Sequence, residues 1–283
     1  MIPRVHVVDV QMRLGETLHI SPIFDAHLDD SLCDYPALLK MAEARRDLPH
    51  HRALWLGDTM NLVVPPDLRR YRPSVQPPGI VGRDDWVNAT LDYVGDKIEA
   101  LGFKNDLFCP GNHEDEHEKR YGLDTTSILA QRFQAGRGGY SGVVDYKFHF
   151  DTSTRSVFRI IYHHGAWGGR LAKGYTGAAP WFAGMDGWNV ALYGHNHASR
   201  VDPEIRRHVH DGRLEEYPVW IVNCGAWVRS YSEDARVTHY AERKGYQMQP
   251  RSCPLIRVTP RRHYKVKNKV RTIRLLLDCT VEV

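Results

Sequence analysis

The sequence predicts an α/β fold, because two kinds of pattern alternate along its 283 residues. Short apolar runs rich in β-branched and aromatic residues indicate buried strands. Between them lie segments in which apolar residues recur every three or four positions, as on the buried face of a helix. The apolar runs also end in polar clusters. Since α/β folds carry their functional residues in the loops at the carboxyl ends of strands, these clusters are candidate site residues.

Six apolar runs are predicted as strands. In chain order they cover residues 18–24, 53–56, 106–110, 157–162, 190–193 and 219–222. The polar clusters after the first five read D-x-H, G-D, G-N-H-E, H-H-G and G-H-N-H, and the sixth run is followed by N-C-G.

Helical periodicity is clearest in residues 85–101, where five apolar residues fall four, three, four and three positions apart. These residues are Val87, Leu91, Val94, Ile98 and Leu101. Asp84 or Asp85 is the expected N-cap, and Gly102 ends the helix. Residues 35–46 and 124–134 carry weaker helical patterns.

No linker or internal repeat divides the chain, so residues 1–283 are predicted to form a single domain. Its core spans about residues 18–225, and a basic, β-rich segment covers 251–283. A Pro-rich irregular insertion is expected at 65–79, and a Gly-rich flexible loop at 136–142.

Composition excludes several classes of protein. A net charge of +4 is too small to indicate a nucleic-acid-binding protein by itself. The five cysteines have no paired spacing, and three of them adjoin apolar runs as core residues do. There is no signal-peptide pattern and no apolar stretch of about 18 residues. A cytoplasmic protein without membrane association is expected.

The polar clusters combine carboxylate, imidazole and amide groups in the way that a pair of metal ions requires. Hydrolysis of a phosphate ester needs a strong nucleophile and neutralisation of phosphoryl charge, which two divalent cations about 3.5–4 Å apart supply through a bridging hydroxide. One carboxylate shared between the ions suits such a pair. A mixed N/O ligand set favours Mn, Fe, Zn, Co or Ni over Mg or Ca.

In this order and at this spacing, the five motifs resemble those of the calcineurin-like metallophosphoesterase superfamily. The resemblance covers about residues 18–225. It implies a four-layer αββα sandwich and a centre with two divalent ions, for which we favour Mn. Each residue alone has an ordinary interpretation as a cap, turn or core residue, but that interpretation must hold at seven positions together.

The resemblance also implies a role for each motif residue. One metal would be held by Asp25, His27, Asp58 and His197, and the other by Asp58, Asn112, His164 and His195. His113 would be the catalytic acid, and Glu114 would orient it and support its charge. We take His164 rather than His163 as the ligand because it directly precedes Gly165. His163 would then support the ligand residues without binding metal itself, or it would face the substrate.

Departures from the family patterns narrow the subclass. Protein phosphatases extend G-D into G-D-x-x-D-R-G, but this chain has Asn61 in place of the second Asp and lacks the Arg-Gly that follows it. The turn at 223–226 is close to the N-x-G-S of many phosphodiesterases but lacks the Ser. Residues 163–174 and 67–71 look similar to phage-encoded and related bacterial members. Arg170 and Lys173 could bind a flanking phosphate or be solvated loop residues.

A basic segment follows the motifs. Lys265, Lys267, Lys269 and Arg271 alternate, so a strand would place all four on one face. Such a stripe could follow a phosphate backbone, but we favour an edge strand whose lysines prevent aggregation.

The predicted function is hydrolysis of a phosphodiester, of nucleotide or nucleic-acid type, by attack of a metal-bridging hydroxide. The alternatives are a phosphomonoesterase, a non-catalytic scaffold of the same fold and a nucleic-acid-binding module with structural metals. Scaffold members of the family have lost the catalytic histidine, whereas this chain keeps His113 and every ligand.

Overall fold

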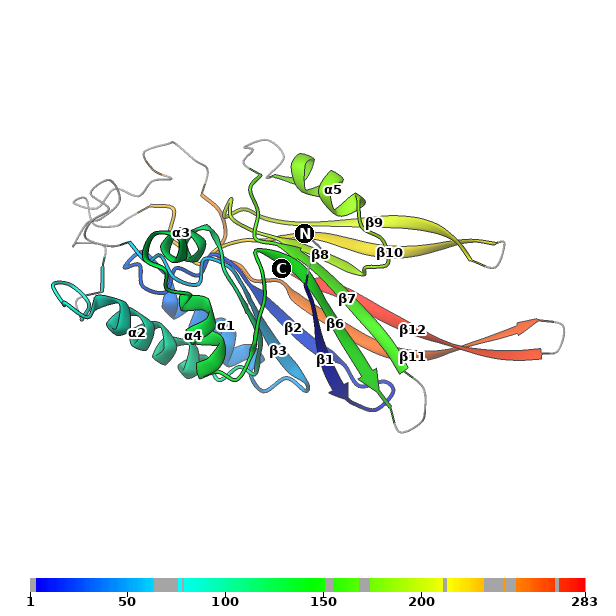
Figure 1. Cartoon of the computed structure of the whole chain (residues 1–283). Helices are drawn as coiled ribbons and strands as arrows, with labels where there is room; N and C mark the ends of the chain where they lie inside the picture. Colours follow the sequence, from blue (N-terminus) through cyan, green and yellow to red (C-terminus); the bar gives the residue numbers. More distant parts are fainter. Residues whose placement is uncertain are drawn as a thin grey trace.

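A computed structural model describes residues 4–63, 76–77, 79–150, 155–167, 174–210, 213–231, 242, 248–267 and 270–282. Over these residues the chain is a mixed α/β structure with two sheets of six strands each (Figure 1). The predicted α/β class is therefore confirmed.

The sheets, called A and B here, are both mixed. Sheet A has the order β1-β6-β7-β8-β10-β9, and sheet B has the order β12-β11-β2-β3-β4-β5. The strands of sheet A are β1 (Arg4–Gln11), β6 (Ser141–His149), β7 (Arg155–His163), β8 (Val190–Tyr193), β9 (Ser199–His210) and β10 (Arg213–Cys224). The strands of sheet B are β2 (Leu18–Ile23), β3 (His51–Leu56), β4 (Asn105–Cys109), β5 (Gly136–Arg137), β11 (Leu255–Lys267) and β12 (Val270–Glu282).

The two sheets pack face to face, and helices cover their outer faces (Figure 1). Strand β3 shows why: Leu54 and Leu56 join the cluster between the sheets, whereas Ala53 and Trp55 belong to the cluster under the helices. Burial of each such large side chain contributes about 1.5–3 kcal/mol. The layers therefore follow the order helix, sheet, sheet, helix.

Helices of the described residues lie on both sides of the sandwich. Sheet B packs against α1 (Tyr35–Arg45), α2 (Trp86–Leu101) and α4 (Thr125–Arg132), and sheet A packs against α5 (Tyr175–Ala183). The remaining helix, α3 (Asn112–Tyr121), begins shortly after β4. The predicted helices at 35–46, 85–101 and 124–134 are confirmed. Helix α2 buries Leu91, Val94 and Ile98 and ends at Gly102, whose φ is 69°.

Strand directions bring the motif loops to one edge of the sandwich. Strands β2, β3 and β4 are parallel neighbours in sheet B. Strands β7, β8 and β10 are parallel neighbours in sheet A. Each of the five motifs begins at or just after the carboxyl end of one of these strands, as the sequence predicted.

Two local predictions are wrong. Residues 136–142 are not simply a loop, because Gly136 and Arg137 form β5 beside β4, and β6 begins at Ser141. Lys265 and Lys267 do not share a strand with Arg271, because β11 ends at Lys267 and β12 begins at Val270, and Lys269 lies outside the described residues. The register pairs Arg271 with Val266 across the hairpin. Most of the predicted Pro-rich insertion lies outside the described residues.

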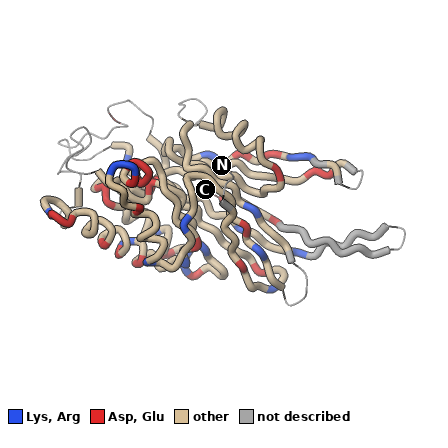
Figure 2. Tube along the Cα trace, viewed as in Figure 1, with Lys and Arg blue, Asp and Glu red and all other residues tan. Residues whose placement is uncertain are grey.

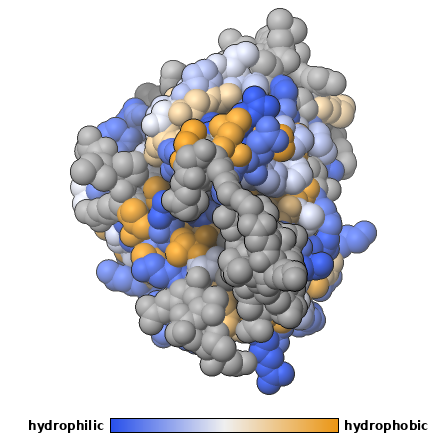
Figure 3. Space-filling view, turned by 90° about the vertical axis from the view of Figure 1, so that its right-hand side faces the viewer, coloured by the Kyte–Doolittle hydropathy of each residue, from blue (hydrophilic) through white to orange (hydrophobic). Residues whose placement is uncertain are grey.

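Charges of both signs are interspersed along the described helices and strands (Figure 2). No helix among the described residues combines the length and apolar character needed to cross a bilayer. The hairpin β9–β10 extends beyond the layered core, toward the end of the molecule seen in Figure 3. Its residues Ile205, Val209 and Leu214 are 62%, 72% and 64% exposed and belong to none of the three buried clusters.

Candidate metal centre

Backbone hydrogen bonds join the motif loops to one another. The N–H of Asp25 donates to the carbonyl of Gly57 at 3.1 Å, and that of His27 donates to the carbonyl of Asp58 at 2.9 Å. These bonds couple the loops after β2 and β3 within sheet B. The N–H of His195 donates to Asp25 Oδ2 at 2.8 Å, which ties a sheet A loop to a sheet B loop. The motifs therefore meet at the junction of the two sheets.

The side chains of all seven predicted ligands converge at this junction. Asp58 Oδ2 lies 3.2 Å from His164 Nε2 and 3.9 Å from His27 Nε2. Asp25 Oδ1 lies 3.7 Å from His197 Nε2. Asn112 Oδ1 lies 2.7 Å from His195 Nδ1 and 3.2 Å from His164 Nε2.

The contacts divide these side chains into overlapping sets. Asp25, His27 and His197 form one group whose candidate ligand atoms lie within 4.8 Å of one another. Asp58, His164 and His195 form a second such group. Asp58 also groups with His27 and His113, so its carboxylate stands between the two sets.

The hydrogen bonding of the buried polar atoms is consistent with cation binding by these residues. Asp25 is fully buried and His27 is 5% exposed, yet Asp25 Oδ1 and His27 Nε2 have no hydrogen-bond partner among the described residues. A buried polar atom without a partner costs about 1–3 kcal/mol. Both atoms have the lone pairs that a divalent cation accepts. The His/Asp groups can therefore hold metal ions.

The backbone is strained at the same residues. Of the eight non-glycine residues with positive φ in the described part of the chain, five are predicted ligands. These are Asp25 (48°), His27 (44°), Asp58 (48°), His195 (70°) and His197 (57°). The left-handed conformation costs about 1–2 kcal/mol per residue, and such strain clusters at functional sites.

Two positions in the motifs require glycine, because side chains of other motif loops pack directly against their backbone. A Cβ on Gly57, whose φ is 109°, would lie 2.2 Å from His164 Nδ1. A Cβ on Gly111 would lie 2.1 Å from Asp58 Oδ1. Each glycine thus leaves room for a predicted ligand of another motif, which is a physical reason for the G-D and G-N patterns.

Burial and charge perturb the titration of the cluster. Burial alone would raise the pKa of Asp58, but the neighbouring His164 and His113 hold that pKa well below its usual range. Burial alone would lower the pKa of His164, but Asp58 and Asp25 raise it to about 9. Burial, opposed by His164, raises the pKa of Asp25 to about 8. Burial and positive neighbours lower the pKa of His27 and His195, which favours their neutral, ligand-competent form.

His113 stands at the rim of the cluster. Its Nε2 lies 4.0 Å from Asp58 Oδ2, and its backbone N–H donates to Asp58 Oδ1 at 3.0 Å. Its Nδ1 lies 2.7 Å from the carbonyl oxygen of Asn61. The His113 side chain is 17% exposed, so a ligand can reach it.

Glu114 does not orient His113 in the way the sequence predicted. Its carboxylate accepts three backbone N–H groups, from Asp58 at 3.1 Å, Met60 at 2.9 Å and Gly111 at 2.8 Å. Burial and the charge of Asp58 raise its pKa to about 7. Glu114 therefore joins the G-D loop to the G-N-H-E loop, and the His113 ring donates instead to the carbonyl oxygen of Asn61.

Of the paired histidines, His164 lies in the cluster and His163 lies beside it. His163 Nδ1 accepts the N–H of Gly165 at 2.9 Å. Its ring packs against Tyr140, Trp167 and Trp181, with centroids 5.4, 4.7 and 4.8 Å away. Successive residues leave the end of β7 on opposite sides, which separates the two histidines. Arg170 and Lys173 lie outside the described residues.

Two residues near the cluster were not singled out from the sequence as site residues. The carbonyl of Asn61 accepts from His113, and buried Asp29 accepts two backbone N–H groups of the same loop. The spacing D-A-H-L-D at 25–29 offered a signal for Asp29. No sequence pattern marks a backbone carbonyl.

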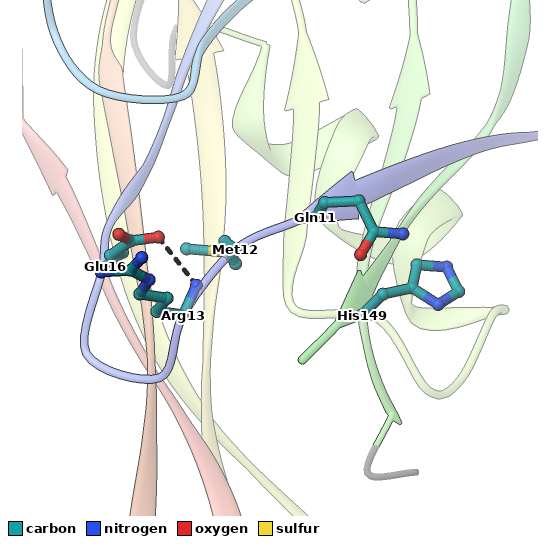
Figure 4. A pocket seen from close by; sticks show the side chains of 5 residues that line it. All are labelled: Gln11, Met12, Arg13, Glu16 and His149. Carbon is teal, nitrogen blue, oxygen red and sulfur yellow. Dashed lines mark hydrogen bonds between the residues drawn. The ribbon is translucent and has the colours of Figure 1, made fainter. Parts of the chain in front are cut away.

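A cavity near the carboxyl ends of β1 and β6 is separate from this cluster. Gln11, Met12, Arg13, Glu16 and His149 line it (Figure 4). The N–H of Arg13 donates to Glu16 Oε2 at 2.7 Å. None of the predicted ligands is among the residues that line this cavity.

The chain was compared with models of protein families and with curated proteins. No model of a protein family matches the chain, and no curated protein matches it.

Proposed function

We propose that this protein is a phosphoesterase that uses two divalent metal ions, as calcineurin-like metallophosphoesterases do. The observation that carries the proposal is the convergence of seven predicted ligands, among which Asp25 Oδ1 and His27 Nε2 are buried without a hydrogen-bond partner in the described part of the chain. Independent support comes from the left-handed backbone at five of these residues. The helix–sheet–sheet–helix layers agree with the fold of that superfamily.

Asp25, His27, Asp58 and His197 would hold one ion, and Asp58, Asn112, His164 and His195 would hold the other. Mn fits this N/O set, as do Fe, Zn, Co and Ni. When bound, two such ions neutralise phosphoryl charge and lower the pKa of water to near neutrality.

The residues of the chain would supply positioning and proton transfer. Asp58 lies between the two ligand sets, so its carboxylate can offset charge in both. His113 is the acid of the proposed reaction. A carbonyl oxygen only accepts hydrogen bonds, so the short contact with Asn61 requires a proton on His113 Nδ1. The proton that His113 gives to a leaving oxygen is then the one on Nε2, which faces the cluster.

A phosphodiester of nucleotide or nucleic-acid type is the proposed substrate class. The absence of the D-R-G sequence after Asp58 removes the arginine with which protein phosphatases grip the phosphoryl group. A phosphomonoester is the second candidate. A scaffold without activity is disfavoured, because strained ligands and a positioned His113 serve no purpose in one.

A turnover screen tests the proposal. The Mn-loaded protein is assayed with bis(p-nitrophenyl) phosphate, cyclic and linear nucleotide diesters, p-nitrophenyl phosphate and a phosphoserine peptide. We expect the diesters to give the highest kcat/KM, with two metal ions bound per chain. Efficient peptide turnover without diester cleavage would contradict the substrate class. Hydrolysis of none of them, with two ions bound, would contradict the enzymatic function.

A further inference from the structure

A buried carboxylate next to the metal cluster holds the turn that contacts His113. Asp29 is 8% exposed and lies two residues after His27. Its Oδ1 accepts the N–H of Asn61 at 2.5 Å, and its Oδ2 accepts the N–H of Leu62 at 2.9 Å. Both carboxylate oxygens of Asp29 therefore accept hydrogen bonds from the loop that follows β3.

One peptide group connects this carboxylate to the catalytic acid. The N–H of Leu62 and the carbonyl of Asn61 belong to the same planar peptide unit. The N–H points to Asp29 Oδ2, and the carbonyl oxygen lies 2.7 Å from His113 Nδ1. The order is carboxylate, peptide, imidazole. A hydrogen bond at one end of a peptide polarises the group and strengthens the bond at its other end.

The turn needs this support because its backbone is strained. Leu62 has a φ of 48°, in the left-handed region that a branched apolar residue rarely adopts. Without the two bonds to Asp29, the turn would relax and rotate the Asn61 carbonyl away from His113. The imidazole could then take the other tautomer or turn.

We propose that Asp29 is a positioning residue that fixes the tautomer and direction of His113 through the 61–62 peptide group. The catalytic consequence rests on the proposed function of His113 as the acid. The structural consequence, a proton held on Nδ1 of His113, does not depend on it.

Asp30 provides a matched control. It is an adjacent acid on the same loop, and its Oδ2 accepts the side-chain amide of Asn61 at 3.0 Å. Unlike Asp29, it does not accept the N–H of the 61–62 peptide group. The substitution Asp30→Asn therefore perturbs the same loop and also removes a carboxylate. It leaves intact the hydrogen bonds that the N–H groups of Asn61 and Leu62 donate to Asp29.

The first readout is the ¹⁵N spectrum of the His113 ring in protein loaded with diamagnetic Zn²⁺. We expect Nδ1 to carry a proton in the wild type and in Asp30→Asn, and to be bare in part of the Asp29→Asn molecules. An Asn at position 29 can accept only one of the two N–H groups, because its amide nitrogen donates. A wild-type His113 that is bare at Nδ1 would overturn the proposal without any variant. So would an unchanged tautomer in a folded Asp29→Asn protein.

The second readout is kinetic. Asp29→Asn should keep both metals and slow alkyl diesters about 10-fold, as loss of an orienting partner typically does. Turnover of p-nitrophenyl esters should change far less, since their leaving group needs little protonation. Added to His113→Ala, Asp29→Asn should slow the reaction no further. Additive losses would show that Asp29 acts elsewhere and would overturn its link to His113.

The two readouts separate this inference from the proposed function. A tautomer change in Asp29→Asn, in a protein that hydrolyses no phosphate ester, supports the positioning role and contradicts the phosphoesterase. Suppose instead that the protein hydrolyses diesters, and that the protonation of His113 Nδ1 is the same in the wild type and in Asp29→Asn. This result supports the phosphoesterase and contradicts the positioning role.

Discussion

Asp58 Oδ2 lies 3.2 Å from His164 Nε2, although the two residues follow strands of different sheets. Asp58 comes after β3 of sheet B, and His164 comes after β7 of sheet A. The contact forms at the junction of the sheets, where both side chains are almost fully buried. A metal centre here would bridge the two halves of the sandwich, so metal binding and sheet packing should be coupled.

Replacement of Asp58 tests the shared carboxylate. Asp58→Asn should bind at most one metal ion per chain and lose nearly all phosphoesterase activity, because one carboxylate offsets charge on both ions. Metal content by elemental analysis and diester turnover measure the two effects. Glu116→Gln, an exposed acid on α3 paired with Arg120, should change neither. Two ions retained at wild-type affinity in Asp58→Asn would show that the ligand assignment is wrong.

Replacement of His113 tests the acid. His113→Ala should keep both metals but slow alkyl diesters about 10²–10⁴-fold, the usual worth of general-acid catalysis. p-Nitrophenyl esters should be affected far less, because their phenolate leaves without protonation. Steady-state kinetics over a series of leaving groups gives the comparison. Equal slowing of both substrate types would indicate that His113 positions the phosphoryl group instead. No slowing of either would contradict its role altogether.

Close packing around Gly57 predicts a steric effect on the centre. Gly57→Ala should reduce metal affinity and lower the free energy of unfolding by about 2 kcal/mol or more, because its Cβ would meet His164. Gly122→Ala is the control, since Gly122 also has a positive φ of 69° but open space around its Cβ. It should cost only about 1 kcal/mol and leave metal binding unchanged. Isothermal titration with Zn²⁺ and chemical unfolding measure both. Unaltered metal affinity in Gly57→Ala would argue against the packing described here.

Stability should fall in mild acid because of His51, a buried residue away from the predicted metal ligands. Burial, aided by Arg45, lowers the pKa of His51 from 6.5 to about 4. Between these pH values the unfolded chain binds a proton that the folded chain excludes, so the free energy of unfolding decreases as the pH falls through this window. The loss from this residue is on the order of 2–3 kcal/mol.

Chemical unfolding from pH 7 to pH 4, with a chelator present, measures this effect. His51→Gln keeps a group that can bond to Ser21, which His51 Nε2 contacts at 3.0 Å, but it does not titrate. The variant should show a shallower pH dependence than the wild type. Identical slopes in the two proteins would contradict a depressed pKa for His51.

The sequence by itself determined the local elements and the residues that follow them. Apolar runs such as 53–56 and the periodicity of 85–101 reflect burial within a few residues of chain, which is why β3 and α2 were predicted. The motif residues were found for the same reason, since each follows the end of a strand. Strands β1 and β6 were missed because their polar residues, such as Asp9 and Lys147, interrupt the apolar pattern.

Only the tertiary structure decided how these residues meet. Asp25 and His195 are 170 positions apart, and the hydrogen bond between them depends on the packing of two sheets. The hydrogen-bonding roles of Glu114 and Asn61 differ from expectation because backbone N–H and carbonyl groups take part, and these carry no sequence signature. The alternation of basic residues did not reveal that Lys267 and Val270 pair across the hairpin β11–β12. Local patterns record burial along the chain, whereas a site assembled from five loops exists only once the sheets have packed.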